Sequence, residues 1–299
     1  MKQILMAEPN ISEGRNLDLV QQVVAAVRAV PGVTVADYSS DADHNRSVIS
    51  FVGEPAAVLE GAKALALKTY ELIDMTQHHG EHPRQGAIDV CAFIPIRNVT
   101  SAEAVSIAKQ FGKFVGELGV PVYFYEDAAT RPERTSLPDL RKGEYEALPT
   151  KLADPKWAPD EGPAVFNPRA GALVTGARFP LEAFNANLRT TELTIAQNIA
   201  KAVRHISGGF RYVRGLGFPL EEKGMVQVSM NLINYTKTPL HRVLETIRSE
   251  AARYGVTVAE TEIVGPIPMD ALQEIVRFYL QCHEFKSEQV LEMALIEES

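Results

Sequence analysis

Three of the seven histidines of this 299-residue chain fall within residues 77–89. They are His78, His79 and His82. Because Gly80 and Pro83 disfavour a continuous helix, we predict that these side chains lie on a loop ahead of a strand at 87–95. An imidazole has an unperturbed pKa of about 6.5 and exchanges protons at neutral pH, so this loop is a candidate for general acid–base catalysis. A solvated turn without catalytic function fits the same spacing equally well.

Two charged neighbours add to this chemistry. Glu81, or another nearby carboxylate, would orient an imidazole, and Arg84 would bind an anionic substrate group through two parallel hydrogen bonds. Zinc binding is the competing interpretation, because His78 and His82 are four residues apart. That spacing is useful on a helix, which the glycine and proline interrupt, and both the H-E-x-x-H order and a neighbouring cysteine are missing. We therefore expect no metal here.

A second polar segment, DYSSDADHNR at 37–46, combines carboxylates with a histidine and an arginine. Asp37, Asp41 and Asp43 resemble a calcium loop in composition only, because the glycine and the terminal glutamate of an EF-hand are missing. One of these carboxylates could accept a proton or bind a substrate nitrogen. A polar hairpin between two strands is the simpler interpretation.

A third segment, EGPAVFNPRAGALVTGAR at 161–178, contains glycines that allow close backbone approach, together with two arginines. They are Gly162, Gly171, Gly176, Arg169 and Arg178. The G-x-G-x-x-G and phosphate-loop patterns are both absent, so neither nucleotide motif is present. A glycine-containing loop between domains is the alternative.

The elements that must position these segments form two similar series. Residues 3–125 indicate a β-α-β-β-α-β order with additions, and residues 183–281 indicate a second one. The proline-rich stretch 127–178 between them is predicted to be mostly loop. Adjacent strand pairs at 33–52 and 211–233 favour an α+β fold over a doubly wound sheet.

We therefore predict two ferredoxin-like subdomains, residues 1–178 and 179–299, with helices on one face of each sheet. The net charge of -8 lacks the basic field of a nucleic-acid-binding protein. No segment approaches the roughly 18 apolar residues that cross a bilayer, and no signal peptide is recognisable. With only two cysteines and no disulfide framework, we expect a cytoplasmic protein that acts on neither nucleic acid nor membrane.

Seven runs of sequence follow one another along nearly the whole chain. They are PNISEGRN (9–16), NRSVISFVG (45–53), LIDMTQHHGEHPRQGAIDVCAFIPI (72–96), PVYFYEDAA (121–129), RKGEYEALPTKL (141–152), WAPDEGP (157–163) and VTGARFPLEAFNANL (174–188). Together they resemble the glutamate formimidoyltransferase, or formiminotransferase, family. The resemblance implies the stand-alone form without a cyclodeaminase domain, a homodimer, and a substrate cleft or tunnel between the two subdomains.

The resemblance also implies an activity. The formimino group of N-formimino-L-glutamate would be transferred to nitrogen 5 of the co-substrate tetrahydrofolate, as in histidine degradation, without a metal. The family's catalytic histidine falls on His82 and its folate segment on 162–171. Where better-known members carry an aspartate, this chain has Ser39, so we assign the assisting acid to Asp41, Asp43 or another carboxylate.

The remaining candidates are assigned to substrate binding. They are Asp37, Asn10, Arg46, Glu81, Arg84, Gly162, Pro163, Phe166, Arg169, Gly171 and Arg178. Three other functions stay open: transfer from a formyl donor, folate binding without catalysis, and a zinc hydrolase.

Overall fold

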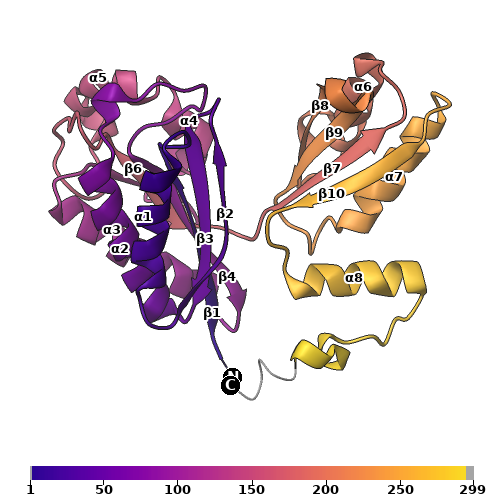
Figure 1. The fold of residues 1–299 in the computed structure, drawn as a ribbon, viewed down its shortest axis with the longest axis horizontal. Coiled ribbons are helices and arrows are strands. Elements are labelled where there is room, and N and C mark those ends of the chain that lie inside the picture. The colour runs from indigo at the N-terminus through magenta and orange to yellow at the C-terminus, as the bar shows by residue number, and fades with distance from the viewer. Residues whose placement is uncertain (1, 294–299) are drawn as a thin grey trace. The chain divides into compact units, whose positions relative to one another are not determined.

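The computed structural model describes residues 2–293, which form two compact units that divide after Arg178 (Figure 1). Each unit contains a β-sheet with helices packed against it, so the predicted α+β class is confirmed. Within the described part of the chain, no helix is both long enough and apolar enough to cross a bilayer.

The first unit contains six strands and five α-helices. The strands are β1 (Ile4–Ile11), β2 (Val33–Asp41), β3 (Arg46–Gly53), β4 (Ile88–Arg97), β5 (Val122–Glu126) and β6 (Leu173–Ala177). The helices are α1 (Leu17–Arg28), α2 (Pro55–Leu72), α3 (Ser101–Glu117), α4 (Leu137–Arg141) and α5 (Leu148–Ala153). They form one sheet in the order β2-β3-β1-β4-β6-β5, antiparallel from β2 to β4 and parallel from β4 to β5.

Local signals place the helix ends. The Asn16 side chain accepts a hydrogen bond from the N–H of Leu19 at the start of α1. At the start of α3, Thr100 and Glu103 form a reciprocal capping box. Both helices then bury an apolar stripe with a spacing of three to four residues. These short-range patterns explain why the apolar spacing of the sequence predicts helices at 17–30 and at 101–117, within two residues of the observed bounds.

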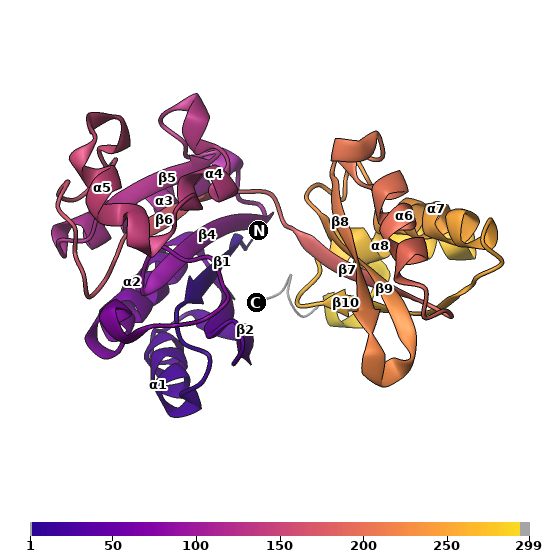
Figure 2. The same cartoon turned by 90° about the horizontal axis from the view of Figure 1, so that it is seen from above.

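Two faces of the first sheet are covered, whereas helices on one face were predicted. α1, α2 and α3 pack on one face and enclose the main core (Figures 1 and 2). The other face carries a second core between the strands β4, β5 and β6 and the segment containing α4 and α5. The stretch 127–178 is rich in loops, as predicted, but it also contains α4, α5 and β6, and its apolar side chains, among them Leu140, Leu148 and Leu152, pack on the sheet.

The second unit contains four strands and three α-helices. They are β7 (Glu182–Leu188), α6 (Leu193–Val203), β8 (Val213–Leu220), β9 (Met225–Leu232), α7 (Leu240–Ala252), β10 (Val258–Val264) and α8 (Met269–Leu280). The sheet is antiparallel throughout, in the order β10-β7-β9-β8. Alternate residues of β7 and β9 join α6 and α7 in one core, as period-2 patterning requires.

The second unit also buries an acid without a partner. Glu182 at the start of β7 is 2 % exposed, and neither of its carboxylate oxygens has a hydrogen-bond partner within the described residues. Burial raises the pKa of this carboxyl to about 7. Because the ordinary value is 4.5, folding favours the protonated acid, and its contribution to stability is lost as the pH rises from about 4.5 through about 7.

We expect Glu182→Gln to make the protein more resistant to urea at pH 8 than at pH 5, relative to the unsubstituted chain. The pKa difference predicts that the free energy of unfolding gained on substitution is larger at pH 8 by about 2–3 kcal/mol. Urea unfolding followed by far-ultraviolet circular dichroism at both pH values measures it. An equal gain at the two pH values would show that Glu182 does not titrate in this range.

Candidate active site

The histidine-bearing loop enters β4 beside the turn that joins β2 to β3. The backbone N–H of Glu81 donates to the carbonyl of Asp43 at 3.2 Å, and that of His82 donates to the carbonyl of His44 at 3.4 Å. Gly80 approaches the same turn closely, since a Cβ at this position would lie 2.4 Å from the His44 carbonyl oxygen. Two segments singled out by sequence are therefore in direct contact.

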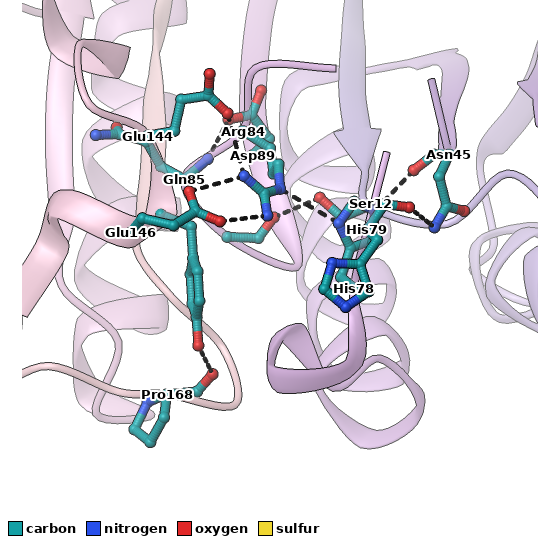
Figure 3. A network of polar contacts seen from close by, with 12 residues as sticks. Ser12, Asn45, His78, His79, Arg84, Gln85, Asp89, Glu144, Glu146 and Pro168 are labelled. Atoms are coloured by element: carbon teal, nitrogen blue, oxygen red, sulfur yellow. Dashed lines mark hydrogen bonds and ion pairs between the residues drawn. The ribbon is translucent and has the colours of Figure 1, made fainter. Parts of the chain in front are cut away.

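Asn45 connects this contact to a third segment (Figure 3). Its amide Nδ2 donates to the carbonyl of His79 at 2.9 Å, and its Oδ1 accepts from the N–H of Gly14 at 3.0 Å. The Ser12 hydroxyl donates to the carbonyl of Gly86 at 2.8 Å. The loop after β1, the β2–β3 turn and the histidine-bearing loop are thus held together by buried hydrogen bonds.

His82 is the histidine of this loop that lies beside a buried acid. Its side chain is 9 % exposed, and its Nε2 lies 3.4 Å from Oδ2 of Asp89, too poorly aligned for a hydrogen bond. The other ring nitrogen, Nδ1, has no hydrogen bond within residues 2–293 and retains contact with solvent. The ring therefore has one nitrogen toward a carboxylate and one without a hydrogen-bond partner among the described residues.

Asp89 is the buried carboxylate that lies beside this ring, whereas Glu81 is exposed. Asp89 accepts a hydrogen bond from the N–H of Gln85 at 2.9 Å and forms an ion pair with Nη2 of Arg141. Burial alone would raise the pKa of the Asp89 carboxyl, but His82 and Arg141 outweigh it and hold that pKa below its usual range. Asp89 is therefore a permanent anion at neutral pH.

His78 and Arg84 belong to the network of Asn45, in which their side-chain nitrogens are occupied (Figure 3). His78 Nε2 lies 2.9 Å from the carbonyl of Asn45, and its Nδ1 accepts from Arg84 Nε at 3.3 Å. Arg84 also binds Glu146 through both terminal nitrogens and Glu144 through one. Both nitrogens of His78 are occupied, so a zinc site that uses His78 with His82 does not fit this geometry.

Strands β1 and β3 of the first sheet carry polar side chains on the face opposite α1. Asn10 of β1 accepts a hydrogen bond from Nη1 of Arg46 on β3 at 3.3 Å. Glu8, two residues before Asn10 on the same face, forms an ion pair with Arg178. Substrate-binding candidates from three distant parts of the sequence thus lie on one face.

The predicted acids of β2 lie toward the edge of the same sheet. Through their pairing partners on β3, Asp37, Ser39 and Asp41 share the face of Arg46. Asp41 Oδ1 accepts the backbone N–H groups of Asp43 and His44, and its Oδ2 lies 3.0 Å from Nδ1 of His44. These contacts, led by the N–H of His44, hold the pKa of Asp41 below its usual range. Asp37, Ser39 and Asp43 are exposed.

The predicted folate segment runs from the end of α3 to the histidine-bearing loop. Gly162 lies against α3 at Gly116, followed by the exposed Pro163. Phe166 packs on Tyr145 with 5.4 Å between ring centroids, and Nη2 of Arg169 donates to the carbonyl of Glu71 at 2.8 Å. Gly171 forms an isolated bridge with Gly86 and has φ +71°, and a Cβ there would lie 2.2 Å from the Gln85 carbonyl oxygen.

Both units match models of known protein families. Residues 4–178 match the family model described as the formiminotransferase domain, N-terminal subdomain, and residues 183–297 match the model described as the formiminotransferase domain. The chain belongs to the formiminotransferase family. Together, the two matches span both units.

Relatives of this formiminotransferase chain come from all three domains of life. A glutamate formimidoyltransferase of Streptococcus pyogenes is 47% identical over 99% of this chain and 100% of its own length. One from Thermoplasma acidophilum is 45% identical over 95% of this chain and 94% of its own length. A formimidoyltransferase-cyclodeaminase of Gallus gallus is 43% identical over 94% of this chain, which spans 53% of that relative.

Sequence reasoning missed three residues at this formiminotransferase site: Glu8, Asp89 and Arg141. All three fall within or beside the runs that resemble the family, but their chemistry depends on contacts with distant residues. Arg141 meets Asp89 across 52 positions of sequence. Residues 2–293 contain no group of three or more histidine, cysteine or acidic side chains placed to hold a metal ion.

Proposed function

We propose that this chain is a glutamate formimidoyltransferase that moves the formimino group of N-formimino-L-glutamate to nitrogen 5 of tetrahydrofolate. The products would be L-glutamate and 5-formiminotetrahydrofolate, the reaction expected in histidine degradation. The observation that carries the proposal is His82, held beside the ionised Asp89 in a chain 47% identical to a glutamate formimidoyltransferase along its whole length.

His82 would act as both general base and general acid. As nitrogen 5 of the folate attacks the formimino carbon, a new C–N bond forms and the attacking nitrogen releases a proton to the imidazole. The tetrahedral intermediate then breaks its bond to the glutamate nitrogen, which receives a proton from the imidazolium. Asp89 stabilises the imidazolium and orients the ring, and Arg141 keeps Asp89 ionised.

The substrates would lie over the face described above. The face of β1, β2 and β3 supports binding of the charged donor, because it carries the polar groups of Asn10, Arg46 and Asp37. The segment 162–171, with Gly162, Pro163, Phe166, Arg169 and Gly171, supports folate binding because Phe166 and Tyr145 offer adjoining aromatic rings.

Several site assignments stay predictions. Asp41 and Asp43 lie next to the histidine-bearing loop and are retained as assisting acids, although Asp41 is already bonded to His44. Glu81, Arg84 and Arg178 are retained as substrate-binding residues, with Arg84 and Arg178 holding carboxylates in this structure.

We also propose the finer architecture. Both sheets contain four antiparallel strands in the order fourth-first-third-second, which supports two ferredoxin-like subdomains. Binding of substrates between the subdomains, a homodimer and a cytoplasmic location are further expectations of the same proposal.

A donor-exchange assay tests the activity. The protein is mixed with tetrahydrofolate and either N-formimino-L-glutamate or N-formyl-L-glutamate, and the folate absorbance is followed. We expect turnover with the formimino donor. Turnover with the formyl donor alone would reassign the chain as a formyltransferase, and saturable tetrahydrofolate binding without product from either donor would reassign it as a folate-binding protein.

A further inference from the structure

Arg46 carries a positive charge that the described chain does not pair. Its Nη1 donates to Asn10, but no carboxylate within residues 2–293 forms an ion pair with it. Its Nε is buried without a hydrogen-bond partner. Burial lowers the pKa of this guanidinium, because taking a cation out of water is unfavourable. An anion from outside the chain would satisfy it.

The carboxylates near Arg46 are already engaged elsewhere. Asp41, Asp89 and Glu8 all act on its pKa through their charge. Their ion-pair partners, however, are His44, Arg141 and Arg178 respectively. Arg46 therefore has no ion-pair partner although three carboxylates lie near it, because each of them is held by another side chain.

Arg141 brings a second unused donor to the same place. Its Nη2 holds Asp89, while its Nε is buried without a partner. Arg46 donates to Asn10 of β1, which pairs with Val90 of β4, and Val90 directly follows Asp89, the acid that Arg141 holds, so the two arginines lie over adjacent positions of neighbouring strands. Two guanidinium groups with spare N–H donors thus lie beside the acid that orients His82.

We propose that Arg46 and Arg141 bind the α-carboxylate of the glutamate portion of the donor, an inference that rests on the proposed function. In N-formimino-L-glutamate the leaving nitrogen and the α-carboxylate share one carbon. With bonds of about 1.5 Å, the carboxylate carbon lies about 2.5 Å from that nitrogen. A receptor beside Asp89 and His82 therefore places the leaving nitrogen near the imidazole, whereas the γ-carboxylate carbon is two bonds further from that nitrogen than the α-carboxylate carbon.

Calorimetric titration of the whole protein with L-glutamate and with L-isoglutamine, its α-carboxamide, tests the receptor without turnover. Hydrogen bonds to charged groups predict that the unsubstituted protein binds L-glutamate ~10- to 100-fold more tightly than the amide. In Arg46→Ala this ratio should fall toward 1, keeping only the contribution of Arg141, and in Arg46→Lys it should be intermediate, because the ammonium keeps the charge without the planar fork.

Arg28→Ala is the matched control. Arg28 is the last residue of α1, on the opposite face of the sheet. Its guanidinium lies over the ring of Tyr38. The Arg28→Ala substitution removes one arginine charge and should leave the ratio of the affinities for L-glutamate and L-isoglutamine unchanged. The proposed binding of the α-carboxylate by Arg46 and Arg141 would be refuted if the affinity ratio persisted in Arg46→Ala, or if L-glutamate did not bind at millimolar concentration. Either result would refute it even if formimino transfer is observed. An Arg46-dependent ratio in a protein that transfers nothing would keep the receptor and refute the proposed function.

Discussion

Replacing His82 with asparagine is expected to lower kcat for formimino transfer by ~10²–10⁴-fold. Asparagine fills similar space but takes up no proton at neutral pH, so the proton lost by the attacking nitrogen has no acceptor. The fold should persist, because Asp89 keeps both the Gln85 N–H and Arg141. Steady-state turnover with tetrahydrofolate and N-formimino-L-glutamate measures the loss, and circular dichroism checks the fold.

His79→Asn is the matched control for this prediction. His79 belongs to the same loop, but its side chain is exposed and only its backbone carbonyl is used, as an acceptor from Asn45. Its substitution should leave kcat within about two-fold. Normal turnover in His82→Asn would remove His82 from the mechanism, and equal losses in both variants would mean that the loop, not the imidazole, had been damaged.

The sequence predicted those elements whose own residues carry the signal, such as a capping side chain or a regular apolar spacing. α1 and α3 have capping side chains and long apolar stripes, and both were predicted close to their bounds. Strand β6 was missed, because its five residues, LVTGA, include Gly176 and follow a proline-rich stretch. It is stabilised by neighbours on both sides, β4 and β5, a long-range effect that no local pattern reports.

At the site, the residue types were predictable and their pairing was not. The His82 segment and the 37–46 segment were identified separately, and their contact through Glu81 and Asp43 depends on how β2, β3 and β4 join one sheet. Asp89 was overlooked as the orienting acid because it opens an apolar strand, where alternation does not reveal which way a side chain points. The face that collects Glu8, Arg46 and Arg178 likewise follows from strand order.

A buried ion pair fixes the start of the proposed folate segment. Arg134 is 1 % exposed; its Nη1 donates to Asp160 at 2.7 Å and its Nη2 to the carbonyl of Ala158 at 2.6 Å. Asp160 also accepts the N–H of Phe124 in β5 at 2.9 Å. Arg134 lies over the ring of Tyr123, whose hydroxyl donates to the carbonyl of Trp157. The residues just before Gly162 are thus attached to β5 by backbone hydrogen bonds with Val122 and by the Arg134–Asp160 ion pair.

Arg134→Ala is expected to lower the free energy of unfolding by about 3–5 kcal/mol, because it leaves the Asp160 charge buried without its cation. Urea unfolding followed by the fluorescence of Trp157, the single tryptophan, reports on this region directly. Arg131→Ala is the control: Arg131 also donates to a carbonyl of this loop, that of Lys156, but from a more exposed position, so its loss should amount to less than about 1 kcal/mol. Similar losses in the two variants would contradict the buried pair as the main attachment, and the 162–171 segment would then be held mainly by the backbone bridges of Glu161 with Val122 and of Gly171 with Gly86.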